Sequence, residues 1–291
     1  MPKLPKQRLA AYLFLLLNTA LWGFAAPIIK YSLQFTTPVL FLFYRFCIAT
    51  LIFLPVYLLY KNRTSKKTNY PLVIFLSLLG VPLTLLPLFY GLELTSSIEG
   101  SILEATSPLF IIIGGLFLLK ENVKPKEWLG FLVAISGTIL LTLDPLINGG
   151  SRLRDISIKG NLLILLSNLI WTIFLLLAKK YKANTTEITF FSFLVSIPFF
   201  LALSLYTGSL SLNPQALPGI LYMAIPGSII AFWAYQEGQK RIEASEAAVF
   251  SYLRPLFAIP LALLWLKEPI TPITIVGFIL ILGGVFFSEK A

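Results

Sequence analysis

The feature that most limits how this chain can fold is a series of ten apolar stretches, each about 20 residues long. A helix of that length crosses about 30 Å of hydrocarbon. We expect spans near 9–31, 38–60, 71–92, 97–119, 126–144, 160–178, 186–206, 217–237, 245–266 and 271–288. The chain is 57% hydrophobic and only 12% charged, whereas a soluble domain carries about 25% charged residues. The sequence therefore predicts an all-α integral membrane protein with ten transmembrane helices, whose surroundings are the lipid bilayer.

The residue types that most enzymes and metal sites depend on are scarce. The chain has no histidine and a single cysteine, Cys47. The commonest metal ligand and the commonest general base at neutral pH are thus missing, and no disulfide can form within the chain. The sequence shows no nucleophile–base pair for an intramembrane enzyme and no Walker phosphate loop for ATP hydrolysis. We expect no enzymatic activity, no cofactor and no metal.

The basic residues are distributed unevenly between the two sides of the membrane. Of the 23 Lys and Arg residues, sixteen fall on the side that holds the N-terminus. Five fall on the other side, namely Lys30, Arg152, Arg154, Lys159 and Lys267, and Arg45 and Arg254 lie within spans. The positive-inside rule then places both termini in the cytoplasm of a multi-pass plasma-membrane protein. This topology accounts for the net charge of +10, and we expect no nucleic-acid partner.

The second half of the chain repeats the first. The phrase PLFIIIGGLFLLKE at 108–121 returns as PLFAIPLALLWLKE at 255–268, an offset of 147. At the same offset Gly91 matches Gly238, Glu99 matches Glu246, Pro125 matches Pro272 and Gly137 matches Gly284; at an offset of 149, Trp22 matches Trp171 and Lys30 matches Lys179. Each half holds five spans, so the second enters the membrane from the opposite side. This predicts two five-helix inverted repeats, 1–150 and 151–291, an arrangement typical of transporters. We place their boundary in the Gly- and Asn-rich connection 145–159.

Ten spans arranged as five plus five, Trp-Gly in the first helix and the repeated P-L-F…L-K-E…P…G-F…G phrase resemble the EamA-type branch of the drug/metabolite transporter superfamily. The resemblance covers essentially the whole chain. It implies a cavity lined mainly by the first, third and fourth helices of each half, with the fifth helices outside and available for a homodimer contact. It also implies export of amino acids or other small metabolites, in some members coupled to protons.

Two ionisable residues lie well inside equivalent spans. Glu104 falls in the fourth span and Arg254 in the ninth, where an ionisable side chain costs about 2.5–3.5 kcal/mol on insertion scales and so marks a functional site. Together they suit a zwitterion, with Arg254 on a carboxylate and Glu104 on an ammonium group or a coupling proton. The alternatives are a static ion pair and an Arg254 bonded to backbone carbonyls.

For the other charged residues the structural interpretation is favoured. By the family resemblance, Arg45 in the second span lies outside the cavity and bonds internally or snorkels. Glu93, Glu99, Glu237, Glu243 and Glu246 read as solvated helix ends, and Glu121 and Glu268 as structural groups at helix exits.

Aromatic and amide residues give a second signal for a binding site. Trp22, Tyr90, Trp171, Trp233, Tyr235 and Tyr252 fall in the expected cavity helices, with Asn18, Asn168 and Gln236 close by in sequence. Asn18 and Trp22 share one helical face, and Asn168 and Trp171 repeat that arrangement. An amide beside an indole suits an amphipathic solute. The alternative is anchoring at the membrane surface or ordinary packing.

The glycine pairs Gly130/Gly137 and Gly277/Gly284 mark helix faces that can approach closely, either within the fold or in a homodimer. The leading interpretation is a secondary transporter that exports a small amphipathic metabolite. The alternatives are a nucleotide-sugar or sugar-phosphate carrier, which would need several basic cavity residues where only Arg254 is expected, and a non-transporting membrane protein.

Overall fold

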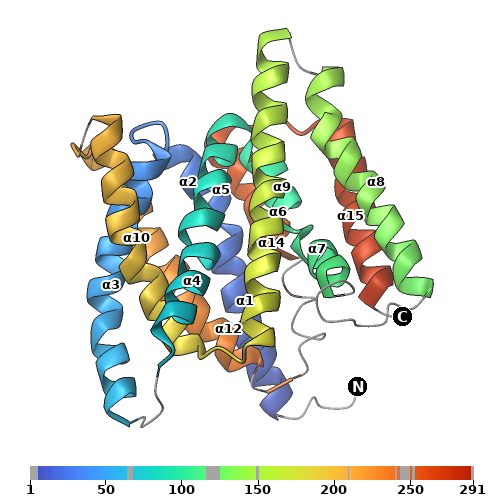
Figure 1. Ribbon diagram of the computed structural model, residues 1–291. Coiled ribbons are helices and arrows are strands. Elements are labelled where there is room, and N and C mark those ends of the chain that lie inside the picture. The colour runs from blue at the N-terminus through green and yellow to red at the C-terminus, as the bar shows by residue number, and fades with distance from the viewer. Residues whose placement is uncertain are drawn as a thin grey trace.

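The computed structural model describes residues 6–63, 68–115, 125–148, 151–208, 210–239, 241–242, 250 and 253–289, and this part of the chain is helical without strands (Figure 1). The helices of the first half are α1 (Lys6–Gly23), α2 (Ala25–Ser32), α3 (Pro38–Arg63), α4 (Tyr70–Gly80), α5 (Pro82–Leu94), α6 (Ser97–Glu104), α7 (Ser107–Gly114) and α8 (Pro125–Asn148). Those of the second half are α9 (Ser151–Lys180), α10 (Thr185–Thr207), η2 (Pro214–Ala216), α11 (Leu217–Ala224), η3 (Ile225–Ile230), α12 (Ala231–Gln239), α14 (Arg254–Leu261), η5 (Ala262–Leu266) and α15 (Pro272–Glu289).

Six helical stretches are long and apolar enough to cross a membrane. They are Gln7–Ser32, Pro38–Asn62, Tyr70–Leu94, Ser157–Lys180, Thr185–Tyr206 and Pro214–Tyr235, and each covers one of the expected spans. Shorter apolar helices, Trp128–Asp144, Arg254–Leu266 and Pro272–Gly284, lie within three of the other four. The remaining expected span, 97–119, contains α6 and α7, which are interrupted at Ala105–Thr106. The chain is therefore a multi-pass helical membrane protein.

One prediction about the middle of the chain is wrong. We expected a long connection over 145–159, but α8 continues to Asn148 and α9 begins at Ser151. Only the glycines at 149 and 150, which lie outside the described residues, separate the two helices. The flanking Leu, Ile, Arg and Lys residues include good helix formers, and glycine is the poorest apart from proline. α8 and α9 therefore extend through most of the predicted connection.

Two spans are broken where proline removes a backbone hydrogen bond. α4 ends before Pro82, and the hydroxyl of Thr84 donates to the carbonyl of Leu79 at 2.8 Å. In the other half, η3 is a π-helical segment containing Pro226, and the hydroxyl of Ser228 donates to the carbonyl of Met223 at 2.7 Å. Side chains thus satisfy carbonyls left free at both breaks, as a membrane interior requires.

Gly130 and Gly137 of α8 and Gly277 and Gly284 of α15 form a glycine seam that joins the two helices within one chain. A Cβ added at Gly137 would lie 2.7 Å from Cβ of Leu280, and one at Gly284 would lie 2.5 Å from the carbonyl oxygen of Gly130. The two helices therefore touch at the very glycines that the sequence left open for a homodimer. The outward faces of the pair stay apolar and exposed, as at Leu132 and Ile279.

A column of aromatic rings packs α3 against α10. Phe46 lies 5.7 Å from Phe193 between ring centroids and is stacked at 6.1 Å on Phe200, and Tyr57 stacks on Phe190 at 4.0 Å. Phe46, Phe193 and Phe200 are fully or nearly fully buried. α3 belongs to the first half of the chain and α10 to the second, so this aromatic core joins the halves.

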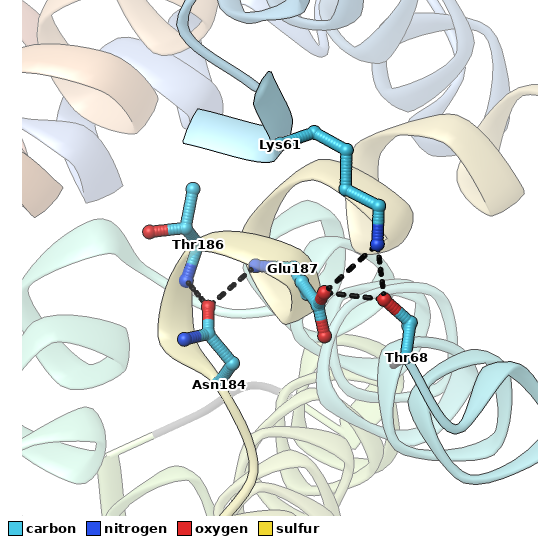
Figure 2. Close-up of polar contacts among 5 residues, drawn as sticks. All are labelled: Lys61, Thr68, Asn184, Thr186 and Glu187. Atoms are coloured by element: carbon cyan, nitrogen blue, oxygen red, sulfur yellow. Dashed lines mark hydrogen bonds and ion pairs between the residues drawn. The ribbon is translucent and has the colours of Figure 1, made fainter. Parts of the chain in front are cut away.

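A polar cluster joins the same two helices at the lower end of the molecule in Figure 1, where α3 ends and α10 begins. Figure 2 shows Lys61 and Thr68 meeting the carboxylate of Glu187. Nζ of Lys61 donates to Oγ1 of Thr68 at 2.8 Å and lies 3.8 Å from Oε1 of Glu187, and the Thr68 hydroxyl donates to the same oxygen. Asn184 caps the start of α10 by accepting from the amides of Thr186 and Glu187. Because the Glu187 side chain is only 8% exposed, its bonds are largely shielded from water.

We expect Glu187→Ala to lower the melting temperature of the purified protein by several degrees. A hydrogen bond to a charged group contributes about 1.5–3 kcal/mol, and each kcal/mol corresponds to about 2–4 °C in a chain of a few hundred residues. Thr185→Ala is the matched control, because Thr185 is exposed in the same helical turn. Equal melting temperatures for the two variants would contradict a stabilising role for this cluster.

Candidate functional site

A cavity of about 160 Å³ lies at the centre of the molecule, with walls from both halves of the chain. Its described lining residues are Trp22, Ala25, Ile29, Arg45, Phe46, Gly80, Val81, Thr84, Leu85, Leu88, Phe89, Glu104, Ser107, Ser167, Asn168, Trp171, Phe193, Met223, Gly227, Phe232 and Arg254. Most of this wall is apolar or aromatic, and among these residues only Arg45, Glu104 and Arg254 are ionisable. A mostly apolar pocket with a few convergent polar groups is the usual form of a small-molecule site.

Arg254 begins α14 and points its guanidinium at the ring of Trp22, 4.5 Å from the centroid. This distance is well within the range of a cation–π contact. Within the described chain the guanidinium makes no hydrogen bond, and its buried Nε has no partner. A Cβ at Gly23 would lie 2.7 Å from the Arg254 carbonyl oxygen, so Gly23 lets α1 approach the start of α14. The Trp-Gly pair thus supplies both a ring for Arg254 and the room to bring it close.

Glu104 is the last residue of α6, at the interruption before α7. Its backbone carbonyl accepts from the hydroxyl of Ser107 at 2.8 Å. Its carboxylate makes no hydrogen bond or ion pair with any residue that the structure describes. Glu104 and Arg254 therefore share one cavity without forming the static ion pair considered from the sequence.

Arg45 corrects the prediction that the second span keeps its arginine away from the cavity. Its guanidinium lines the cavity wall, and the residue is only 6% exposed. Nε and Nη2 donate to the hydroxyl of Ser228 at 3.2 and 3.0 Å, and the ring of Phe46 lies 5.0 Å from the guanidinium carbon. Its Nη1 has no hydrogen-bond partner in the described part of the chain. One edge of the guanidinium is therefore held by the protein and the other is free.

Asn18 and Trp22 fasten α1 to the π-helical break in the second half. Nδ2 of Asn18 donates to the carbonyl of Ala231, and Nε1 of Trp22 donates to the carbonyl of Gly227, both at 2.9 Å. The Asn18 amide nitrogen is thus occupied, and Asn18 does not line the cavity. Trp22 does line it, with its ring face toward Arg254.

Asn168 and Trp171 have related positions on α9. Nδ2 of Asn168 donates to the carbonyl of Leu103 at 2.8 Å and to Oγ1 of Thr106 at 3.1 Å, and its Oδ1 accepts from the Ser107 hydroxyl at 2.9 Å. Asn168 therefore holds the interruption that presents Glu104. Trp171 lines the cavity, and in the described structure its indole N–H makes no hydrogen bond.

Two of the other predicted site residues lie away from the cavity. Tyr90 packs beside the apolar core and Trp233 is 52% exposed with its ring edge-on to Phe14, and neither lines the cavity. Gln236 belongs to α12, but its side chain is not among those that the structure describes, and Tyr252 lies outside the described residues.

The sequence analysis did not identify Phe46 and Phe193, which both line the cavity and whose rings pack against each other. They are 147 residues apart, the offset of the repeated phrase, so extending the comparison into the second and seventh spans would have found them. The same offset relates Gly80 to Gly227, which also line the cavity.

The carboxylates at the opposite end from the Glu187 cluster serve the fold. Glu268 accepts from the amides of Ser97 and Ile98 and from the Ser97 hydroxyl, so it caps the start of α6. Glu99 accepts from Asn161 at 2.8 Å and from Thr95 at 3.0 Å. These contacts agree with the structural interpretation of Glu268 and show that Glu99 is bonded rather than simply solvated.

The comparisons with known proteins agree with this architecture. The EamA-like transporter family matches residues 9–143 and 158–289. Uncharacterized transporter YetK of Bacillus subtilis (strain 168) is 28% identical over 296 residues, covering 98% of this chain and 88% of the relative. A probable amino-acid metabolite efflux pump of Escherichia coli (strain K12) is 24% identical over 302 residues, covering 94% of this chain and 92% of the relative. A solved crystal structure, described only as that of a protein, has the same fold, with a TM-score of 0.68 and 20% identity over 96% of both chains. The match over nearly all of both halves shows that this chain is a membrane transporter of the EamA-like transporter family.

Proposed function

We propose that this transporter is a secondary active exporter of small amphipathic metabolites such as amino acids. It would work by alternating access between two inverted repeats of five spans, 1–150 and 151–291. The observation that carries the proposal is the central cavity, in which a carboxylate, guanidinium groups and two indoles stand in an apolar wall drawn from both halves. The relative that is named an amino-acid metabolite efflux pump supports the same substrate class.

Equivalent hydrogen bonds support the inverted repeat. Asn18 of α1 donates to the carbonyl of Ala231, and Ser167 of α9 donates to the carbonyl of Thr84. The donors are 149 residues apart and the acceptors 147, the two offsets found in the sequence. The same contact therefore occurs twice with the halves exchanged, as a pseudo-twofold axis requires, and the family also matches each half separately.

The topology that goes with this proposal has ten spans and both termini in the cytoplasm of the plasma membrane. The Glu187 cluster would then lie at the cytoplasmic end. A homodimer through α8 and α15 would have to use their outward faces, around Leu132 and Ile279, because the glycines of the seam are already in contact within the chain.

In the cavity, Arg254 would bind a carboxylate and Glu104 an ammonium group or the coupling proton, since neither charged group makes a hydrogen bond or ion pair within the described structure. The indoles of Trp22 and Trp171 would contact the apolar body of the substrate, with the free N–H of Trp171 as a donor. Asn18 and Asn168 would position these groups through their bonds to the helix breaks rather than bind substrate directly.

A sugar-phosphate carrier is a second candidate, because Arg45 adds the second basic group that such substrates demand. A nucleotide sugar fits less well, since a volume of about 160 Å³ is below the roughly 300–1,000 Å³ typical of larger ligands.

The test is counterflow of radiolabelled substrates in proteoliposomes, with amino acids, sugar phosphates and sugars as the panel. Saturable exchange of amino acids supports the proposal, exchange of sugar phosphates alone supports the second candidate, and no exchange with any class contradicts both. In Glu104→Gln we expect exchange to persist while uptake driven by a pH gradient is lost, because the amide cannot carry a proton. If Glu104→Gln keeps gradient-driven uptake, the proton is carried elsewhere.

A further inference from the structure

The cavity contains more positive than negative charge among its described residues. Arg45 and Arg254 contribute two guanidinium groups, which stay protonated in proteins, and Glu104 contributes one carboxyl group. The excess is one positive charge when Glu104 is ionised and two when it is protonated. A zwitterion leaves this excess unchanged, and an uncompensated charge in a low-dielectric site is costly. In either protonation state of Glu104, only a net-negative ligand reduces the excess.

Arg45 lines the cavity and has one hydrogen-bond donor without a partner in the described chain. Its Nε and Nη2 both donate to the hydroxyl of Ser228, which in turn donates a hydrogen bond to the carbonyl of Met223. That arrangement fixes the plane of the guanidinium and leaves Nη1 buried without a hydrogen bond. A purely structural arginine would satisfy its outer donors with backbone carbonyls. Arg45 instead lines the cavity while its buried Nη1 has no partner within the described structure.

Arg254 has the complementary arrangement. The guanidinium carbon lies over the Trp22 ring, 4.5 Å from its centroid, and its N–H donors have no hydrogen-bond partner in the described chain. Arginine binds oxyanions through the edge of its guanidinium, with two parallel N–H donors. Trp22 is itself fixed by its bond to Gly227, so the ring that orients Arg254 is also held in place.

From these contacts we infer that the transported solute is a small organic anion with net negative charge, and that Arg45 and Arg254 together bind its oxyanion groups. The inference rests on the proposed function and narrows its substrate class from amphipathic metabolites in general to acidic ones. An acidic or N-acylated amino acid satisfies it through carboxylates, and a sugar phosphate satisfies it through a phosphate. Arg45 becomes the residue that determines specificity for charge.

The test compares solutes of matched shape and different charge. Glutamate is paired with glutamine, N-acetyl-leucine with leucine, and glucose 6-phosphate with glucose. Each is titrated into purified protein in nanodiscs, with tryptophan fluorescence as the readout because Trp22 and Trp171 line the cavity. The variants are Arg45→Gln, Arg45→Lys and, as the matched control, Arg241→Gln, whose arginine pairs with Glu237 and does not line the cavity.

In the wild type and in Arg241→Gln, we expect the anion of at least one pair to bind about tenfold or more tightly than its partner. That ratio corresponds to about 1.4 kcal/mol. In Arg45→Gln the ratio should fall to near one, and Arg45→Lys, which keeps the charge but loses the fixed fork, should give an intermediate value. A preference within the glutamate or N-acetyl-leucine pair identifies a carboxylate as the bound group, and a preference within the glucose 6-phosphate pair identifies a phosphate.

The inference is overturned if the wild type binds the uncharged or zwitterionic member of every pair equally well or better, or if Arg45→Lys and Arg45→Gln both keep the full preference. Counterflow with the same solutes separates this failure from failure of the transport proposal. Exchange of a zwitterion without anion preference overturns the charge inference and leaves transport standing. Arg45-dependent anion binding without any exchange supports the charge inference and contradicts transport.

Discussion

Arg254→Gln is expected to weaken substrate binding by about a hundredfold. Removing one partner of a buried, hydrogen-bonded charge pair costs about 2–5 kcal/mol, and each 1.4 kcal/mol is a factor of ten. Arg254 would form such a pair with a substrate carboxylate, because its guanidinium lies on the cavity wall and makes no hydrogen bond to the described protein. Concentration-dependent counterflow in proteoliposomes measures the change in affinity. The affinity of Arg254→Lys should lie between those of Arg254→Gln and the wild type.

The same variant separates a binding role from a structural one. A guanidinium without hydrogen-bonded protein partners gives up only its contact with Trp22 when it is replaced, and the protein is relieved of a buried charge. We therefore expect the melting temperature of Arg254→Gln to stay the same or rise while affinity falls. A clear drop in melting temperature with unchanged affinity would show that Arg254 serves the fold. Arg241→Gln, outside the cavity, should leave affinity unchanged.

Gly284→Ala is expected to lower the melting temperature by several degrees, whereas Gly283→Ala leaves it unchanged or raises it slightly. A Cβ at Gly284 would lie 2.5 Å from both the amide nitrogen of Ala134 and the carbonyl oxygen of Gly130. These are backbone atoms, so the α15 and α8 backbones would have to move apart. Overpacking of this kind costs about 1–3 kcal/mol. A Cβ at Gly283 would meet nothing within 4 Å, and alanine is the better helix former.

This glycine pair is a stringent comparison because the two changes are chemically identical and adjacent on α15. Thermal denaturation of both variants in the same detergent gives the difference directly. Equal shifts would mean that α8 and α15 do not pack through the glycine seam. Gly284→Val should produce a larger drop than Gly284→Ala, since two further methyl groups enter the same contact.

Much of this architecture could be predicted from the sequence because it depends on the apolar stretches and on the internal repeat, which are both visible along the chain. Six of the expected spans appear as helices long enough to cross a membrane, and shorter helices fill others. Glu104 and Arg254, the ionisable residues that the sequence places inside equivalent spans, both line the cavity, as do the repeated Trp22 and Trp171.

Arg45 shows why the rest could not be predicted. In a membrane helix the faces toward lipid and toward protein are both apolar, so periodicity does not reveal which side of α3 faces inward. The rule on buried charges would have assigned Arg45 to the site, but the family resemblance placed its span outside. Trp233 shows the opposite error, since an aromatic residue in a cavity helix can equally face outward.

The pair of bonds from Asn18 to Ala231 and from Ser167 to Thr84 has a mechanical consequence. Each bond ties a helix of one half to a helix break of the other, so the first helix of each half is exchanged between them, as in a domain swap within one chain. A motion that slid the two halves past each other would have to break both bonds. A motion that preserves them moves α1 together with η3 and α12, and α9 together with α4 and α5. The units that tilt during transport would then each combine helices from both halves, and would not be residues 1–150 and 151–291.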